Sequence, residues 1–119
     1  MEQELSQKDA LSVVICRELG ADANIVTQVE QGVEEEQVPV FLVTGSGSSM
    51  DLAGMAAESS LLGIGVGVDQ KGVITLSHFR MPPDLPVFQV SAKEKPSVGK
   101  IIGINAARLF KGIPFSKFL

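Results

Sequence analysis

The chain has 119 residues, which is enough for one domain with a hydrophobic core of its own. Hydrophobic residues make up 45% of it and charged residues 20%, as in an ordinary globular fold, and the net charge is −4. There is no Trp or Tyr to stack on bases, no dense Lys/Arg cluster, and no apolar run near the ~20 residues that span a bilayer, so the sequence argues against nucleic-acid and membrane binding. The polar N-terminus and the lone cysteine predict a cytoplasmic protein without an internal disulfide.

The charges are divided unevenly along the chain. Residues 1–60 hold eleven acids and two bases, a net charge of −9, whereas residues 61–119 hold three acids and eight bases, a net charge of +5. A compact domain can bring these halves together as an acidic surface beside a basic one, which suits electrostatic docking of another protein. The alternative is that the charges only solvate different helices.

Hydrophobic periodicity and turn residues predict eight elements. Five strands are predicted at 11–16, 38–44, 62–69, 73–79 and 87–91. Three helices are predicted at 21–36, 50–60 and 97–111. The first helix has apolar residues at 25, 26, 29 and 33, the spacing of one helix face, and Asp22 or Asn24 can cap its start.

Proline and glycine mark several boundaries between these elements. Pro39 interrupts the chain before the second strand, and Gly112 followed by Pro114 ends the last helix. The strand at 62–69 has glycine at alternate positions 63, 65 and 67, so one of its faces must be approached closely, and helix packing is the favoured cause.

The order of elements predicts the fold class. Alternating strands and helices indicate a mostly parallel sheet with helices on both faces, and the tight "DQKG" turn reverses the fourth strand. We therefore expect an α/β protein, a three-layer α/β/α sandwich around a five-stranded mixed sheet with strand four antiparallel. It forms a single domain over 1–119, with residues 1–10 as a flexible extension.

Three features of the sequence could in principle form a ligand-binding or catalytic site. The loop "GSGSS" at 45–49 precedes a helix and resembles a phosphate cradle of a small-ligand domain, but it lacks the Lys of a P-loop, and a capped loop is favoured. His78 has no second histidine beside it in the sequence, so a structural hydrogen bond is favoured over a base or ligand role. Cys16 lies in an apolar strand and is expected in the core. No spacing suggests a catalytic triad or dyad, and we expect no active site.

The last helix carries a polar residue on its apolar face. Asn105 falls in the stripe formed by Val98, Ile101, Ile102 and Leu109, where an unpaired amide would cost ~1–3 kcal/mol, so we expect it to bond a neighbouring loop. Arg108 lies at the edge of that stripe, where it can pair with an acid or reach a partner.

Three segments carry a resemblance to a known family. "GVEEEQVPV" at 32–40, "SSLLGIGVGVD" at 59–69 and "NAARLFKGIPF" at 105–115 are similar to the small subunit of the diol/glycerol dehydratase-reactivating factor, over residues 11–118. The related medium subunit of adenosylcobalamin-dependent diol dehydratase shares the glutamates, the glycine-alternating strand and "NAAR". The short chain and its "KGIPFSKFL" ending favour the reactivating factor, whereas "GIGVGVDQKG" favours the alternative, a structural dehydratase subunit that contacts cobalamin.

The resemblance implies a non-catalytic, chaperone-like subunit. In the family the small subunit joins a large subunit with an actin-like ATPase fold, and the complex releases damaged cobalamin from diol or glycerol dehydratase by subunit exchange. The small subunit itself is then expected to hydrolyse no ATP and to bind no cobalamin. The expected partners are the large subunit and dehydratase subunits, in the cytosol or in a bacterial microcompartment.

The resemblance also implies a role for the three adjacent glutamates. In the family the middle glutamate, Glu35 here, contributes to a magnesium site shared with the large subunit. At ~100° per residue, Glu35 lies about 135° from the apolar stripe, Glu34 points outward on the other side, and Glu36 falls near the core side, where we expect it at a frayed end or in a local bond. Glu34, Glu35 and Arg108 are therefore expected at the partner interface.

Overall fold

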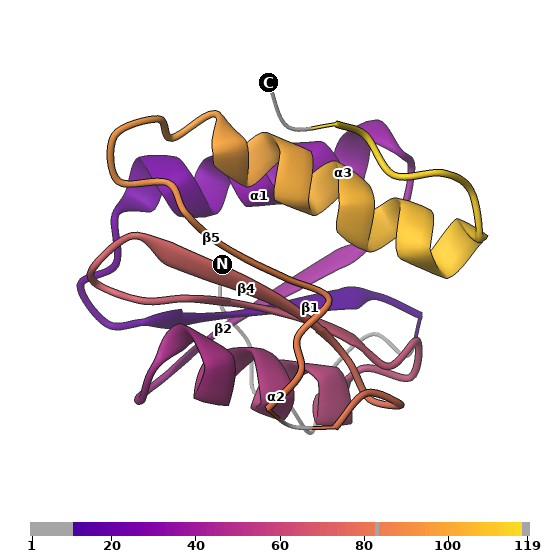
Figure 1. Ribbon diagram of the computed structural model, residues 1–119, viewed down its shortest axis with the longest axis horizontal. Coiled ribbons are helices and arrows are strands. Elements are labelled where there is room, and N and C mark those ends of the chain that lie inside the picture. Colours follow the sequence, from indigo (N-terminus) through magenta and orange to yellow (C-terminus); the bar gives the residue numbers. More distant parts are fainter. Residues whose placement is uncertain (1–10, 83, 118–119) are drawn as a thin grey trace.

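The computed structural model describes residues 11–82 and 84–117 (Figure 1). The predicted flexible extension at 1–10 lies outside the described residues. The elements in order are β1 (Val13–Glu18), α1 (Ala23–Glu35), β2 (Val40–Gly45), α2 (Ser49–Ser59), β3 (Ile64–Val68), β4 (Val73–His78), β5 (Phe88–Ser91) and α3 (Val98–Lys111).

The strands form one sheet in the order β2-β1-β3-β4-β5. Strand β1 pairs in parallel with β2 and β3, whereas β4 is antiparallel to both β3 and β5, so β4 alone runs against the other four strands of this sheet. Helices α1 and α3 cover one face of the sheet and α2 covers the other (Figure 1). The predicted mixed sheet with an antiparallel fourth strand is confirmed.

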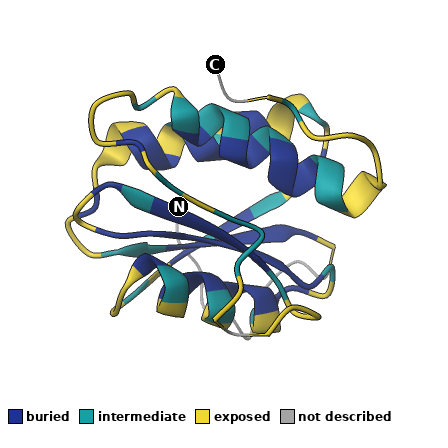
Figure 2. Cartoon of the chain, viewed as in Figure 1, coloured by how far each residue is buried: buried dark blue, intermediate teal, exposed yellow. Residues whose placement is uncertain are grey.

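The core lies on both faces of the sheet, and the strands are mostly buried between the helix layers (Figure 2). The first strand lies two residues later than predicted. Leu11 is 61% exposed and does not begin it, and the strand continues through Arg17 and Glu18, which lie opposite Thr44 and Gly45 of β2. The predicted strand ended with the apolar run at Cys16, whereas its sheet pairing extends over two further, polar residues.

The glycines of β3 allow α2 to lie directly on the sheet. A Cβ atom at Gly65 would lie 2.2 Å from the Ala57 backbone nitrogen, and one at Gly67 would lie 2.1 Å from the Ser49 carbonyl oxygen. These distances leave no room for a side chain, so helix packing explains the two glycines within the strand, as predicted. Gly63 precedes the strand and has a φ of +74°, which favours glycine for a different reason.

A second set of glycines joins α1 to α3. A Cβ atom at Gly103 would lie 2.1 Å from the Val29 carbonyl oxygen, and one at Gly32 would lie 2.1 Å from the Lys100 carbonyl oxygen. Gly99 faces Ile25 in the same way, at 3.0 Å from its carbonyl oxygen. Because Ile25 meets Gly99 and Val29 meets Gly103, the contacts advance along both helices together, so the two helices run side by side in the same direction, with their backbones nearly in contact (Figure 1).

Two glycine-to-alanine substitutions should have opposite effects on stability. We expect Gly103→Ala to lower the free energy of unfolding by about 2 kcal/mol or more, because the new methyl group forces two backbones apart. Gly54→Ala in α2, where a Cβ atom meets nothing within 4 Å, should raise it by ~0.5–1 kcal/mol through helix propensity. Urea denaturation measures both, and a Gly103→Ala variant as stable as the parent would contradict the backbone contact.

Candidate functional site

The glutamate stretch closes helix α1. Asp22 caps the start of the helix by accepting a hydrogen bond from the Asn24 backbone N–H at 2.8 Å. At the other end the Gln37 N–H bonds the Glu34 carbonyl, the Val38 N–H bonds the Val33 carbonyl, and Gln37 has a φ of +61°. This pair of bonds around a left-handed residue is the Schellman ending of a helix. The chain therefore leaves the helix just after Glu36 and enters β2.

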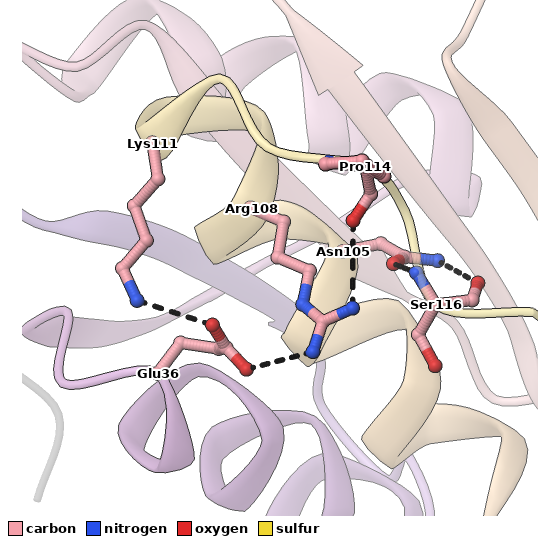
Figure 3. Close-up of polar contacts among 6 residues, drawn as sticks. All are labelled: Glu36, Asn105, Arg108, Lys111, Pro114 and Ser116. Atoms are coloured by element: carbon pink, nitrogen blue, oxygen red, sulfur yellow. Dashed lines mark hydrogen bonds and ion pairs between the residues drawn. The ribbon is translucent and has the colours of Figure 1, made fainter.

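Glu36 is fixed by two cations from α3 (Figure 3). Its carboxylate accepts hydrogen bonds from Lys111 Nζ at 3.1 Å and Arg108 Nη2 at 3.3 Å, and its side chain is only 16% exposed. The Lys111 hydrogen bond is the main cause that lowers the pKa of Glu36; burial opposes it and the Arg108 contact adds to it. The expected local bond or frayed end is therefore wrong, because the partners lie 72 and 75 residues away.

The direction of the helices explains why these charges meet. Because α1 and α3 run in parallel, their C-terminal ends lie together, and each end carries a partial negative charge from its unpaired carbonyls. A carboxylate placed there is unfavourable by ~0.3–1 kcal/mol unless cations accompany it. Arg108 and Lys111, both in the last turn of α3, supply those cations for Glu36 and for both helix ends.

Glu35 lies on the outer side of the same helix end. Its carboxylate forms an ion pair with Lys100 of α3, and the two side chains are 48% and 41% exposed, respectively. Glu34 is exposed, as its helical phase predicted, and its charge adds to burial in raising the pKa of Glu30. Glu34 and Glu35 are thus both exposed, whereas Glu36 is largely enclosed beside α3.

Asn105 clamps the C-terminal segment onto α3. Its buried side chain accepts a hydrogen bond from the Ser116 N–H at 2.6 Å and donates one to the Ser116 carbonyl at 3.1 Å (Figure 3). This confirms the predicted bond to a neighbouring segment. Arg108 Nη1 also donates to the Pro114 carbonyl at 3.4 Å. Of the two roles expected for Arg108, the structure shows pairing with an acid.

The other candidate residues have structural roles. Ser48 and Asp51 form a capping box at the start of α2, and Ser49 Oγ bonds Thr75 Oγ1 at 2.8 Å, so the "GSGSS" hydroxyls serve the fold. His78 Nδ1 accepts a hydrogen bond from the Arg80 N–H at 3.1 Å, and burial, with a smaller effect of the Arg80 charge, lowers its pKa. Cys16 is buried in the cluster between the sheet and α2, as predicted.

The exposed carboxylate of Glu35 is chemically suited to serve as one ligand of a metal ion. An exposed carboxylate is a hard oxygen donor, and magnesium in proteins commonly uses one or two carboxylates with waters. Within residues 11–82 and 84–117, no three His, Cys, Asp or Glu side chains are grouped to hold a metal ion. An ion at Glu35 would therefore need ligands beyond any cluster of three such side chains within the described residues. None of the described helices is both long and apolar enough to cross a membrane.

The Glu36 cluster should make stability depend on pH. We expect Glu36→Gln to be less stable than the parent at pH 7, because the amide cannot balance two cations. Since the folded-state pKa of Glu36 is lowered, its contribution is present above the ordinary glutamate pKa of about 4.3 and is lost as the pH falls through the folded value. Urea denaturation from pH 7 to pH 3 should show the two stabilities converging. Glu34→Gln, an exposed neighbour, is the matched control, and a constant gap down to pH 3 would contradict the role of the Glu36 charge.

Comparison with known proteins shows which family this chain resembles in sequence. The family model described as "Dehydratase medium subunit" matches residues 11–116. The propanediol dehydratase-reactivating factor small subunit of Salmonella typhimurium is 35% identical, over 78% of this chain and 80% of the relative. The diol dehydratase-reactivating factor small subunit of Klebsiella michiganensis is also 35% identical, over 74% of this chain and 70% of the relative.

Solved structures agree with the sequence relatives. A glycerol dehydratase reactivase superposes with a TM-score of 0.84 at 29% identity, covering 90% of this chain and 97% of that chain. A diol dehydratase-reactivating factor complexed with ADP and Mg2+ superposes with a TM-score of 0.83 at 32% identity, covering 92% of this chain and 100% of that chain. The chain therefore belongs to the dehydratase medium subunit family and, within it, to the small subunits of diol and glycerol dehydratase-reactivating factors.

Proposed function

We propose that this chain is the non-catalytic subunit of a chaperone-like complex that, with an ATPase large subunit, releases damaged cobalamin from adenosylcobalamin-dependent diol or glycerol dehydratase. The small subunit would leave the large subunit while a dehydratase subunit takes its place. The observation that carries this proposal is the likeness in sequence and fold to reactivating-factor small subunits over nearly the whole domain. The structural roles of "GSGSS", His78 and Cys16 support a binding module over an enzyme.

The proposed contact with the large subunit lies at the C-terminal end of α1. Glu35 would hold a magnesium ion there, and the bound ion would supply positive charge between Glu35 and oxygen ligands of the large subunit. A solved diol dehydratase-reactivating factor is complexed with ADP and Mg2+, which supports magnesium as an ion that such a complex binds. Glu34 would face the partner beside Glu35, and the exposed edge of Arg108 would extend the same surface.

Native mass spectrometry tests the proposed assembly. The chain is expressed together with a large subunit of a reactivating factor and measured with and without ATP. We expect a complex of the two subunits whose amount changes with nucleotide. If the chain instead binds dehydratase catalytic subunits and never the ATPase subunit, it acts as a structural subunit of the dehydratase and the proposal fails.

Glu35→Gln tests the metal contact. The amide keeps the shape of the side chain but is a poor magnesium ligand, so assembly with the large subunit should weaken about tenfold or more and should no longer respond to magnesium. Analytical ultracentrifugation over a series of magnesium concentrations measures this. Glu58→Gln removes an exposed carboxylate from α2, on the opposite face of the sheet, and should leave the magnesium response intact. Unchanged assembly of the Glu35 variant at every magnesium concentration would contradict the metal role.

A further inference from the structure

The two carboxylates at the end of α1 are held in different ways. Glu36 is mostly buried and is bonded to two cations, one of which is also tied to the C-terminal segment. Glu35 is about half exposed, and in the described part of the chain it has one ion pair, with Lys100. An exposed pair of this kind typically contributes only 0.2–1 kcal/mol, because water screens it and both side chains lose freedom. Glu36 is therefore locked into the fold, whereas Glu35 can exchange its partner.

Lys100 is well placed to be displaced without disturbing the packing. The backbone of Lys100 lies against Gly32 in the contact between α1 and α3, so its Cα position is fixed by the helices. Its ammonium stands at the end of a flexible four-carbon stem that reaches outward along the surface to Glu35. The ammonium can leave the carboxylate by rotating the stem, while the backbone stays where it is.

We propose that Lys100 is a built-in counter-ion that competes with magnesium for the Glu35 carboxylate. This inference rests on the proposed role of Glu35 in binding the large subunit. In the separate subunit the ammonium neutralises the carboxylate and so keeps an unpaired negative charge away from the negative end of the α1 dipole. A divalent cation that binds Glu35 is repelled by the ammonium at the same carboxylate, so its binding is favoured when the ammonium moves away. Lys100 thereby raises the magnesium concentration needed for assembly.

Lys100→Met tests this competition, because methionine keeps much of the apolar stem and removes the charge. Assembly with the large subunit is followed by analytical ultracentrifugation in the presence of ADP while magnesium is varied. We expect the variant to reach half-maximal assembly at a magnesium concentration about two- to fivefold lower than the parent, which is the range set by an exposed ion pair. Circular dichroism confirms that the variant is folded.

Two comparisons separate a local competition from a general charge effect. Lys93→Met removes the same charge from an exposed lysine that lies beside Gly72, and it should leave the midpoint unchanged. In a chain that already carries Glu35→Gln, Lys100→Met should have no further effect on the response to magnesium, because the carboxylate for which the ammonium competes is gone.

The outcomes distinguish this inference from the proposed function. If Glu35→Gln abolishes the magnesium response but Lys100→Met leaves the midpoint in place or raises it, the competition is refuted and the metal role of Glu35 stands. An equal shift in the Lys93 variant also refutes it, since the effect would then be one of total charge. If Glu35→Gln itself leaves the magnesium response intact, both the metal role and the competition fall.

Discussion

The close contact between α1 and α3 is the constraint on which the charged surface at their C-terminal ends depends. Gly32, Gly99 and Gly103 place no side chain of their own between the two helices, so the backbones of these parallel helices come close together. Parallel packing gathers two negative helix ends at one place. Cations placed there stabilise the arrangement, and Arg108 and Lys111 supply them. The glycines thus permit the close packing in which Arg108 and Lys111 reach Glu36.

The same contact gives three adjacent glutamates three different environments. A helix turns about 100° per residue, so neighbours in sequence point in different directions. Glu36 turns toward α3 and is enclosed, Glu35 lies on the outer rim within reach of Lys100, and Glu34 stays in solvent. An acidic run that looks uniform in the sequence therefore divides into one residue used for stability and two that remain accessible to a partner.

Much of the fold followed from the sequence, whereas the pairing of charges did not. The β-branched runs, the helix stripe at 25–33 and the stop at Gly112 located nearly every element, because each depends on neighbours in the chain. Helical phase correctly placed Glu34 and Glu35 outside, but it could not name Lys100 or Lys111, since those residues come from another helix 65 and 75 positions away. The uneven charge of the two halves was the available signal: it left open whether acids and bases meet or only solvate different helices, and the structure pairs Glu35 and Glu36 with bases of α3.

The segment "NAARLFKGIPF", which carried the most specific resemblance to the family, has structural roles within the chain. In "NAARLFKGIPF", Asn105 clamps Ser116, Arg108 holds both Glu36 and Pro114, Gly112 ends the helix with a φ of +71°, and Phe115 packs edge-on against Phe88. These contacts all lie within the chain and close its C-terminal end. A motif whose contacts all lie within the chain indicates which fold the chain adopts and does not by itself indicate a binding site. At this end of the molecule Glu34, Glu35 and Lys100 are more exposed than Glu36, which is why the proposed partner contact is placed on them.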